Sequence, residues 1–249
     1  MQYGICNLSV VPLRSTPSDH AELSSQVLYG EHFKVLEKQK YRSRIRLAYD
    51  HYEGWIDNKQ YLLIEEAVYT SLDKQPPGLC ADMVEFITDH NGQLMPVPIG
   101  SHVGTAPLLS HSFDGRIQQT GDNKQNLIPT AYLFLNAPHH QGGKTPFGID
   151  AAGLAQMVYK LNGYPLKREA AQQATQGEPL SFIEESEPGD LAFFDDDEGN
   201  IVHTGIIMQD NYIIHTDGKV RIDRIDHTGI FNVDTRRHTH KLRVIKKII

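Results

Sequence analysis

Alternating hydrophobic and polar positions dominate the first 65 residues of the chain. The alternating runs are short and are separated by turn-forming stretches; they lie at residues 5–11, 26–36, 42–47 and 52–56. Alternation with a period of two is typical of strands that bury one face. Several such strands separated by turns favour a small barrel. The pattern therefore predicts a β-barrel over residues 1–65.

Residues 66–122 show no sustained periodicity. They contain several prolines beside glycines, namely Pro76, Pro77, Pro96, Pro98 and Pro107. Proline and glycine interrupt regular elements, so only short strands are expected here. Two interpretations stay open for this region: a degenerate second barrel, or a linker of mixed structure.

From residue 123 the pattern changes to helices and then to strands. Apolar residues recur at i, i+3, i+4 and i+7, which marks one face of a helix: Leu154, Met157, Val158 and Leu161. Asp150 is placed to cap this helix and Gly163 to end it. Shorter helices are expected at 129–135 and 167–174, and strands at 189–194, 202–208, 212–215, 220–223 and 241–247. A helix packed on antiparallel strands predicts an α+β domain over 123–249.

The charge and hydropathy of the chain argue against some classes of binding partner. A net charge of −7 argues against a nucleic-acid surface, which needs clustered Lys and Arg. No run approaches the ~20 apolar residues of a membrane span. The first residues lack the basic start and apolar stretch of a secretion signal, so the protein is expected to be cytoplasmic, unless a signal was removed and it acts in the periplasm or outside the cell. Cys6 and Cys80 do not form a disulfide framework, and no cofactor is expected.

The start of the helix at residue 150 is suited to activating a nucleophile. Free N–H groups and the helix dipole create positive potential there, which would lower the pKa of a thiol. His203 and His215 lie on two expected neighbouring strands, where one imidazole could serve as a base and the other could orient it. At the position of the expected cysteine, however, the chain has Ala151. A methyl group cannot attack a carbonyl carbon.

Two sets of segments resemble known domains. Residues 12–15, 28–31 and 54–56 (PLRS, LYGE and GWI) resemble, in that order, a bacterial SH3-like domain. Residues 145–150, 170–173, 189–194, 202–206 and 213–215 (TPFGID, AAQQ, GDLAFF, VHTGI and IIH) resemble the NlpC-type cell-wall peptidases, a papain-like group of cysteine endopeptidases often preceded by SH3-like domains. The resemblance implies one or two N-terminal SH3-like barrels followed by a papain-like α+β domain.

The resemblance also implies a reaction and its residues. Family members cleave the γ-D-glutamyl bond to a diamino acid in peptidoglycan stem peptides, and those with SH3-like domains require a free N-terminal L-alanine. The family motif Asp-Cys-Ser-Gly is here Asp150-Ala151-Ala152-Gly153, and a Tyr that helps to bind the substrate amine is replaced by His139. Of the amine-binding set only Asp150 is retained, and His139 and His140 are expected to refill the space left by larger aromatic residues. Glu53 of the first barrel is a further candidate for the amine pocket.

Three hypotheses account for these departures. Because the changes are spread over residues 139–141 and 151–152, the favoured one is a natural pseudoenzyme that binds a cell-wall peptide or another small peptidic ligand. The second is an active cysteine peptidase in which an experimenter replaced Cys by Ala at position 151. The third is a scaffold that binds a protein partner.

Clusters of histidine and aspartate suggest metal sites, and each has a simpler interpretation. His139 and His140 lie beside each other and would point to opposite sides of a strand, so no zinc site is predicted with His203 and His215. The His238-Thr239-His240 stretch is interpreted as alternation on an edge strand. The acidic stretch at 195–200 lacks the spacing of an EF-hand calcium loop and is expected to be a hairpin tip.

Overall fold

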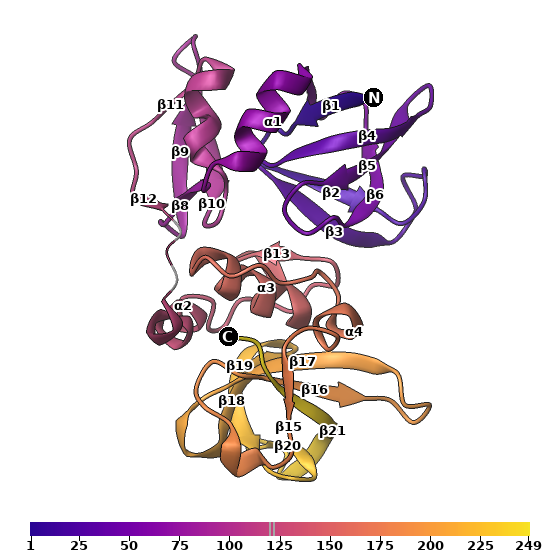
Figure 1. Ribbon diagram of the computed structural model, residues 1–249, viewed down its shortest axis with the longest axis vertical. Helices are drawn as coiled ribbons and strands as arrows, with labels where there is room; N and C mark the ends of the chain where they lie inside the picture. The colour runs from indigo at the N-terminus through magenta and orange to yellow at the C-terminus, as the bar shows by residue number, and fades with distance from the viewer. Residues whose placement is uncertain (120, 122) are drawn as a thin grey trace. The chain divides into compact units, whose positions relative to one another are not determined.

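The computed structural model describes residues 1–119, 121 and 123–249, and the chain divides into two compact units. The first unit comprises Met1–Gly121 and Gln141–Pro146, and the second comprises Asp122–His140 and Phe147–Ile249. Figure 1 shows the elements of both units in chain order. No helix among the described residues is long and apolar enough to cross a membrane.

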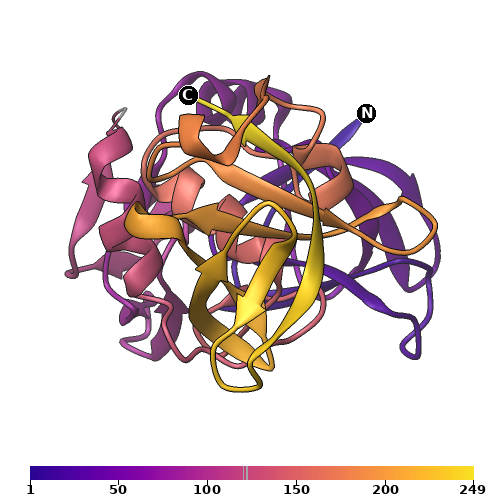
Figure 2. The same ribbon diagram turned by 90° about the horizontal axis from the view of Figure 1, so that it is seen from below.

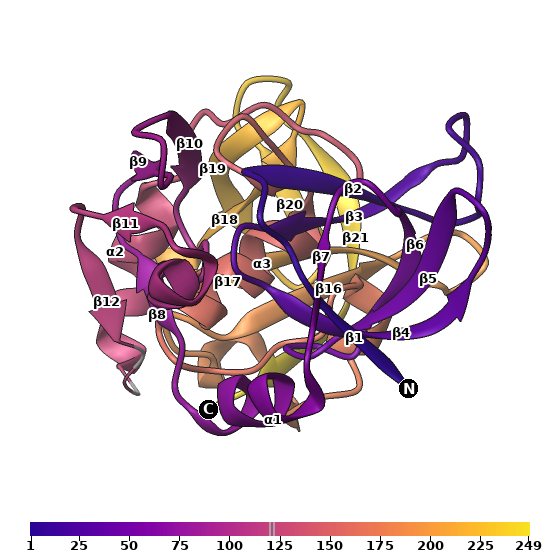
Figure 3. The same cartoon turned by 90° about the horizontal axis from the view of Figure 1, so that it is seen from above.

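The first unit begins with one antiparallel sheet of seven strands (Figure 3). The strands are β1 (Gln2–Ile5), β2 (Val10–Arg14), β3 (Leu23–Leu28), β4 (His32–Lys38), β5 (Arg42–Leu47), β6 (Glu53–Asp57) and β7 (Leu62–Ile64). Their order across the sheet is β3-β2-β6-β5-β4-β1-β7. The predicted runs all lie in this sheet, and the first and last strands, β1 and β7, pair with each other as well.

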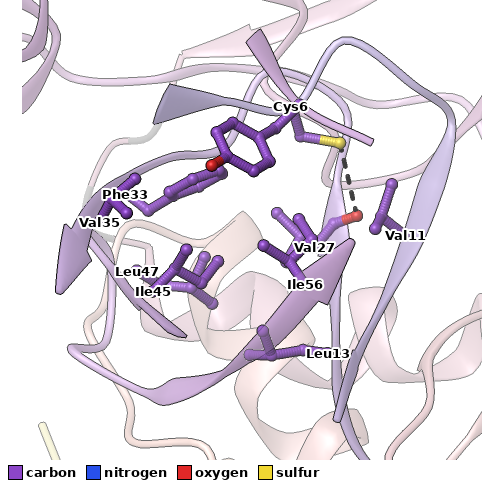
Figure 4. Packing of buried hydrophobic residues seen from close by; sticks show 10 residues of the cluster. Cys6, Val11, Leu13, Val27, Phe33, Val35, Ile45, Leu47 and Ile56 are labelled. Atoms are coloured by element: carbon purple, nitrogen blue, oxygen red, sulfur yellow. Dashed lines mark hydrogen bonds between the residues drawn. The ribbon is translucent and has the colours of Figure 1, made fainter. Parts of the chain in front are cut away.

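The sheet encloses a compact apolar core (Figure 4). It consists of the inward-facing positions of the alternating runs, with Cys6 at one end: Val11, Leu13, Val27, Phe33, Val35, Ile45, Leu47, Ile56 and Tyr61. Cys6 is fully buried, its Sγ lies 3.8 Å from the carbonyl oxygen of Val27, and burial raises the pKa of its thiol to about 12. Cys6 is therefore a packing residue.

The region after this sheet is ordered and has its own core. It contains α1 (Glu66–Lys74), the pair β8 (Gly78–Cys80) and β12 (Ile117–Gln119), and a three-stranded sheet of β9 (Val84–Thr88), β10 (Leu94–Pro98) and β11 (Ser112–Phe113), with a 3-10 helix at Val103–Leu109. One buried cluster of this region is completed by Tyr29, from the turn between β3 and β4, and otherwise contains Cys80, Ile87, Val97, Val103 and Ala106. The two small sheets are separate in their hydrogen bonding, so a second barrel stays a prediction.

Residues 141–146 belong to the first unit although the chain has by then entered the second. The strand β13 (Lys144–Thr145) lies in this segment. The backbone N–H of Lys144 donates to Gln26 Oε1 at 2.7 Å, and its buried Nζ lies 3.4 Å from Glu31 Oε1. Gly142 has a φ of +77°, and a Cβ there would lie 2.3 Å from the carbonyl oxygen of Leu23. The segment is thus fitted closely to β3, a relationship that the sequence pattern did not predict.

The helices of the second unit precede its sheet. They are α2 (Leu127–Tyr132), α3 (Ala151–Leu161) and α4 (Ala170–Gln173), with 3-10 turns at Lys124–Asn126, Ile183–Glu185 and Gln209–Asn211 and the short strand β14 (Gly148–Ile149) before α3. The prediction for α3 is confirmed, and the short helix predicted at 129–135 is present as α2 but ends at Tyr132, with turns at 133–136. The helix predicted at 167–174 is too long: Gln176 Oε1 accepts from the backbone N–H of Lys167, Glu169 is extended, and α4 begins only at Ala170.

The strands of the second unit close into a barrel (Figure 2). They are β15 (Glu178–Leu180), β16 (Leu191–Asp195), β17 (Ile201–Ile207), β18 (Tyr212–Asp217), β19 (Lys219–Ile225), β20 (Gly229–Asn232) and β21 (Arg237–Lys247). Neighbours from β16 to β20 pair in chain order, and β21 pairs with both β16 and β20. Residues 238–240 of β21 pair with β20 alone, since β16 joins β21 only from Lys241 on; a register shift in this stretch interrupts the predicted alternation. The acidic stretch at 195–200 forms the end of β16 and the hairpin tip before β17, as predicted.

Candidate functional site

The site starts at the first turn of α3. Asp150 is the N-cap, in extended conformation, and its Oδ1 accepts a hydrogen bond from the backbone N–H of Gly153 at 2.6 Å. Ala151 and Ala152 follow in the first turn and are 7% and 8% exposed. The helix packs on β17 and β18. The predicted cap is confirmed, and a side chain at position 151 would experience the positive end of the helix.

Asp150 is also one half of a buried ion pair. Arg168 Nη1 lies 3.0 Å from Asp150 Oδ1, and Arg168 Nη2 lies 2.7 Å from Asp150 Oδ2. Both residues are buried, with exposures of 6% for Asp150 and 2% for Arg168. Both carboxylate oxygens are therefore occupied by donors of the protein itself. Sequence reasoning assigned Asp150 to ligand binding and missed Arg168, which lies in the stretch mistaken for a helix.

Two histidines and an aspartate form a hydrogen-bonded row across β17, β18 and β19. His203 Nε2 lies 3.0 Å from His215 Nδ1, and His215 Nε2 lies 3.0 Å from Asp223 Oδ2. An ionised carboxylate only accepts hydrogen bonds, so His215 carries its proton on Nε2 and accepts on Nδ1 from His203. The row leaves Nδ1 of His203 as a proton acceptor. The structure thus brings together the two histidines that the sequence singled out, and adds Asp223 behind them.

Asp223 is held in its ionised form. Burial raises its pKa, but hydrogen bonds from His215, Arg221 and the backbone N–H of Val233 outweigh this effect and hold the pKa well below its usual range. Arg221 Nε lies 2.6 Å from Oδ2 and Arg221 Nη2 lies 2.9 Å from Oδ1. A fixed carboxylate of this kind orients the imidazole of His215 and stabilises its Nε2–H tautomer.

A third histidine joins the pair. The ring of His240, on β21, stacks on that of His203 with 4.1 Å between centroids, and lies 5.5 Å from the ring of His215. Burial, followed by the neighbouring imidazoles of His240, His215 and His139, lowers the pKa of His203 well below its usual value. Burial and His215 likewise lower the pKa of His240 to about 4, against the opposing effect of Asp217 and Asp223. His203 and His240 are consequently uncharged at neutral pH.

Sequence reasoning missed His240 because it assumed regular alternation along this strand. Two histidines at i and i+2 share one face of a regular strand. A register shift opposite Ile230 and Phe231 breaks that regularity in β21, and His238 pairs with Asp226 instead. The sequence contains no signal for this shift.

His139 and His140 lie just before α3 in the chain. The backbone N–H groups of His139 and His140 donate to the carbonyl oxygens of Gly218 and Ile149, at 3.0 and 3.2 Å. Both residues are exposed. Their exposure is compatible with lining an open pocket, and the expectation that they refill the space left by larger aromatic residues stays a prediction. His139 nevertheless lies close enough to His203 to affect its pKa.

Glu53, the fourth residue assigned to ligand binding, is in β6 of the first unit. Its carboxylate accepts from Arg44 Nη2 at 2.5 Å and from Arg46 Nη2 at 2.6 Å. These contacts satisfy Glu53 within its own sheet. Its role in binding a ligand stays a prediction.

Chemically, the site contains a proton acceptor without a nucleophile beside it. Nδ1 of His203 could take a proton from a thiol or a water molecule. The side chain at position 151 is a methyl group, which has no proton to give.

Two family models match separate parts of the chain. Residues 13–60 match the bacterial dipeptidyl-peptidase Sh3 domain, and residues 136–238 match the NlpC/P60 family. The γ-D-glutamyl-L-lysine dipeptidyl-peptidase of Bacillus subtilis is 31% identical over 102 residues, which are 40% of this chain and 34% of that protein. Dipeptidyl-peptidase 6 of Lysinibacillus sphaericus is 25% identical over 223 residues, 73% of this chain and 78% of that protein. The chain thus spans about a third of the first relative and most of the second.

Solved structures share the fold at low sequence identity. An NlpC/P60 family protein from Bacillus cereus has a TM-score of 0.77 with 16% identity, and each chain is covered to 99%. An NlpC/P60 endopeptidase from Photobacterium damselae subsp. piscicida has a TM-score of 0.63 with 13% identity over 97% of this chain and 70% of that one. Together with the sequence matches, these confirm the expected α+β class with an N-terminal SH3-like domain and a papain-like domain.

Proposed function

Because this chain joins a bacterial SH3 domain to a domain of the NlpC/P60 family of peptidases, we propose that it is a catalytically inactive member that binds a peptide of the bacterial cell wall. Two relatives are named as dipeptidyl-peptidases, one of them for a γ-D-glutamyl-L-lysine bond. Their names suggest the ligand class, a stem peptide with a γ-linked D-glutamate.

The observation that carries the proposal is Ala151 at the start of α3, on a helix that packs against the strands of His203 and His215. The resemblance assigns this position to the cysteine nucleophile. Loss of a nucleophile from a catalytic set commonly costs several orders of magnitude in rate. The base and its orienting partners are retained, but without a thiol they have no covalent step to support. Recognition of the peptide is then the function that remains.

The contacts of Asp150 change its predicted part in recognition. Its two oxygens are engaged by Arg168 and by the N–H of Gly153, so its negative charge is already balanced. In the proposal Asp150 sets the start of α3, and exposed His139 contacts the peptide. A pocket filled by the side chains of residues 139–141 would have favoured a protein-binding scaffold, and all three of these residues are exposed.

Isothermal titration tests the proposal directly. The probes are L-Ala-γ-D-Glu-L-Lys and the same peptide with diaminopimelate in place of lysine. We expect micromolar binding of at least one of them, and recovery of the intact peptide by chromatography after prolonged incubation. His139→Ala should weaken binding, whereas the matched change at His227, an exposed histidine in a turn, should not.

Two outcomes would contradict the proposal. Absence of heat at millimolar peptide would exclude stem peptides of this kind as the ligand. Cleavage of the peptide would show that the chain is a working peptidase despite its alanine.

A further inference from the structure

Three histidine side chains converge inside the second unit. His203 lies on β17, His215 on β18 and His240 on β21, and each offers one ring nitrogen such that these atoms all lie within 4.8 Å of one another. His203 Nε2 and His215 Nδ1 are 3.0 Å apart. Two imidazole nitrogens bound to one tetrahedral zinc ion at ~2.0–2.1 Å are about 3.3 Å apart. The spacing of this pair is close to that geometry, whereas the rings of His203 and His240 stack with 4.1 Å between their centroids, so one of these two rings has to rotate before both lone pairs can point at one ion.

The rings are held in place by neighbouring groups. Asp223 Oδ2 accepts from His215 Nε2 at 3.0 Å, which leaves Nδ1 of His215 for a second partner. Metal-bound histidines almost always donate their other N–H to a carboxylate or carbonyl in this way. Thr239 Oγ1 lies 2.9 Å from His240 Nδ1 and orients that ring. His215 thus already donates its other ring N–H to a carboxylate, as a metal-bound histidine does.

The charges around the three rings also suit a cation. The carboxylate of Asp223 lies behind His215, and Arg221 donates to both of its oxygens. A divalent ion among these groups would meet neutral ligands and one supporting carboxylate, a set that binds Zn²⁺, Ni²⁺ or Cu²⁺ well and Ca²⁺ or Mg²⁺ poorly.

We propose that His203, His215 and His240 bind a divalent transition-metal ion, for which Zn²⁺ is the best match. Three histidines leave a fourth coordination position for a water molecule or a ligand atom, as in zinc sites of the three-histidine type. His240 lies beyond residues 136–238, the span that matches the NlpC/P60 family, so the third ligand comes from outside the matched region.

The proposal and a peptidase relay make opposite demands on His203. In the peptidase arrangement, the Nε2–H of His203 donates a hydrogen bond to His215 Nδ1. A metal ion would occupy the lone pairs of these same two nitrogens, and the proton of His203 would have to move to Nδ1. A metal ion would have to displace the hydrogen bond between these two nitrogens. In this respect the metal site rests on the proposed loss of thiol chemistry, but metal binding is measured without any peptide.

The test uses the full chain without a polyhistidine tag. Zn²⁺ affinity and stoichiometry are measured by competition with a chromophoric chelator, and Co²⁺ is added separately to record its visible absorption bands. We expect one tightly bound equivalent and the intense bands of four-coordinate Co²⁺. His240→Ala should lower the affinity at least ~10-fold, and Asp223→Asn should lower it ~10–100-fold, the usual effect of removing an outer-shell partner.

His238→Ala is the matched control, because His238 lies on the same strand but pairs with Asp226 at the surface. Its affinity should equal that of the parent protein. The proposal is overturned if the parent binds no stoichiometric Zn²⁺, or if the His238 and His240 variants lose affinity equally. Should His240→Ala fail to fold, His240→Gln and the Co²⁺ spectrum of the parent protein decide the same question.

Discussion

Arg168 donates two hydrogen bonds to Asp150, one to each carboxylate oxygen, and the pair is buried at the start of α3. Removing one partner of a buried ion pair leaves the other charge without compensation, which costs ~3–5 kcal/mol. Arg168→Met should therefore lower the free energy of unfolding by about that amount, measured by urea denaturation. The same change at exposed Arg237 is the control, and a loss of the same size there would refute a special role for the pair.

The histidine cluster predicts a fall in stability on mild acidification. The pKa of His240 is about 4 in the folded protein, and that of His203 is also depressed, against about 6.5 for an unfolded histidine. Unfolding therefore takes up protons between pH 6.5 and 4, so the stability present above pH 6.5 is lost as the pH falls through this window. Urea midpoints at a series of pH values measure the loss.

A substitution assigns that loss to the cluster. His240→Gln removes one proton-binding group and should flatten the dependence between pH 6.5 and 4, whereas His227→Gln should leave it as in the parent. An unchanged slope in the His240 variant would contradict the assignment. Below pH 4, protonation of Asp223 should destabilise the protein further, because its pKa is also held low by the folded structure.

Two glycines of the first unit with the same backbone conformation predict different mutational costs. Gly142 and Gly92 have φ values of +77° and +78°, but a Cβ at Gly142 would lie 2.3 Å from the carbonyl oxygen of Leu23, whereas a Cβ at Gly92 would meet no atom within 4 Å. Gly92→Ala should cost ~1–2 kcal/mol, the usual penalty of the left-handed region. Gly142→Ala should cost clearly more, since the segment 141–146 must move off β3. Thermal unfolding of the two variants compares them, and equal losses would show that this contact is unimportant.

A cysteine at position 151 should be reactive. It would lie at the N-terminus of α3, which lowers the pKa of a thiol. The thiols of Cys6 and Cys80 are buried and have pKa values raised to about 12 and about 11, so they should react slowly. In Ala151→Cys, iodoacetamide at neutral pH should therefore modify one site, identified by peptide mass spectrometry. Slow labelling, at the rate of the parent protein, would exclude an activated position.

The same variant distinguishes an engineered alanine from a natural one. If Ala151 were a single replacement in a working peptidase, Ala151→Cys would restore rapid cleavage of L-Ala-γ-D-Glu-L-Lys. We expect little or no cleavage from it, and some recovery only when Ala152→Ser is added, because position 152 also departs from the family motif. Full activity of the single variant would refute the pseudoenzyme hypothesis.

The elements with regular periodicity could be predicted from the sequence, and so could the residues at their ends. Leu154, Met157 and Leu161 identified α3, and Asp150 its cap, because capping depends on a few neighbouring residues. His203 and His215 were placed on adjacent strands for the same local reason. These predictions required no knowledge of how distant parts of the chain meet.

The relationships that were missed depend on distant contacts. The stretch around Arg168 has helical propensity, but its side chain reaches Asp150, and the backbone of Lys167 is held by Gln176, so the helix starts later. His240 lies in the histidine cluster at the point where β21 shifts register against β20. Residues 141–146 lie beside β3, more than a hundred positions earlier in the chain. Periodicity carries no information on such pairings.

In the second unit, β21 closes the barrel, and this constrains the order in which the unit can fold during synthesis. The strands β16 to β20 leave the ribosome first, yet β16 and β20 acquire their shared neighbour only when β21 has been made. Until then both have unpaired backbone groups, which can associate with other chains. The nascent protein therefore has to shield two open sheet edges, and a chaperone that binds extended segments would be most useful to it in that interval.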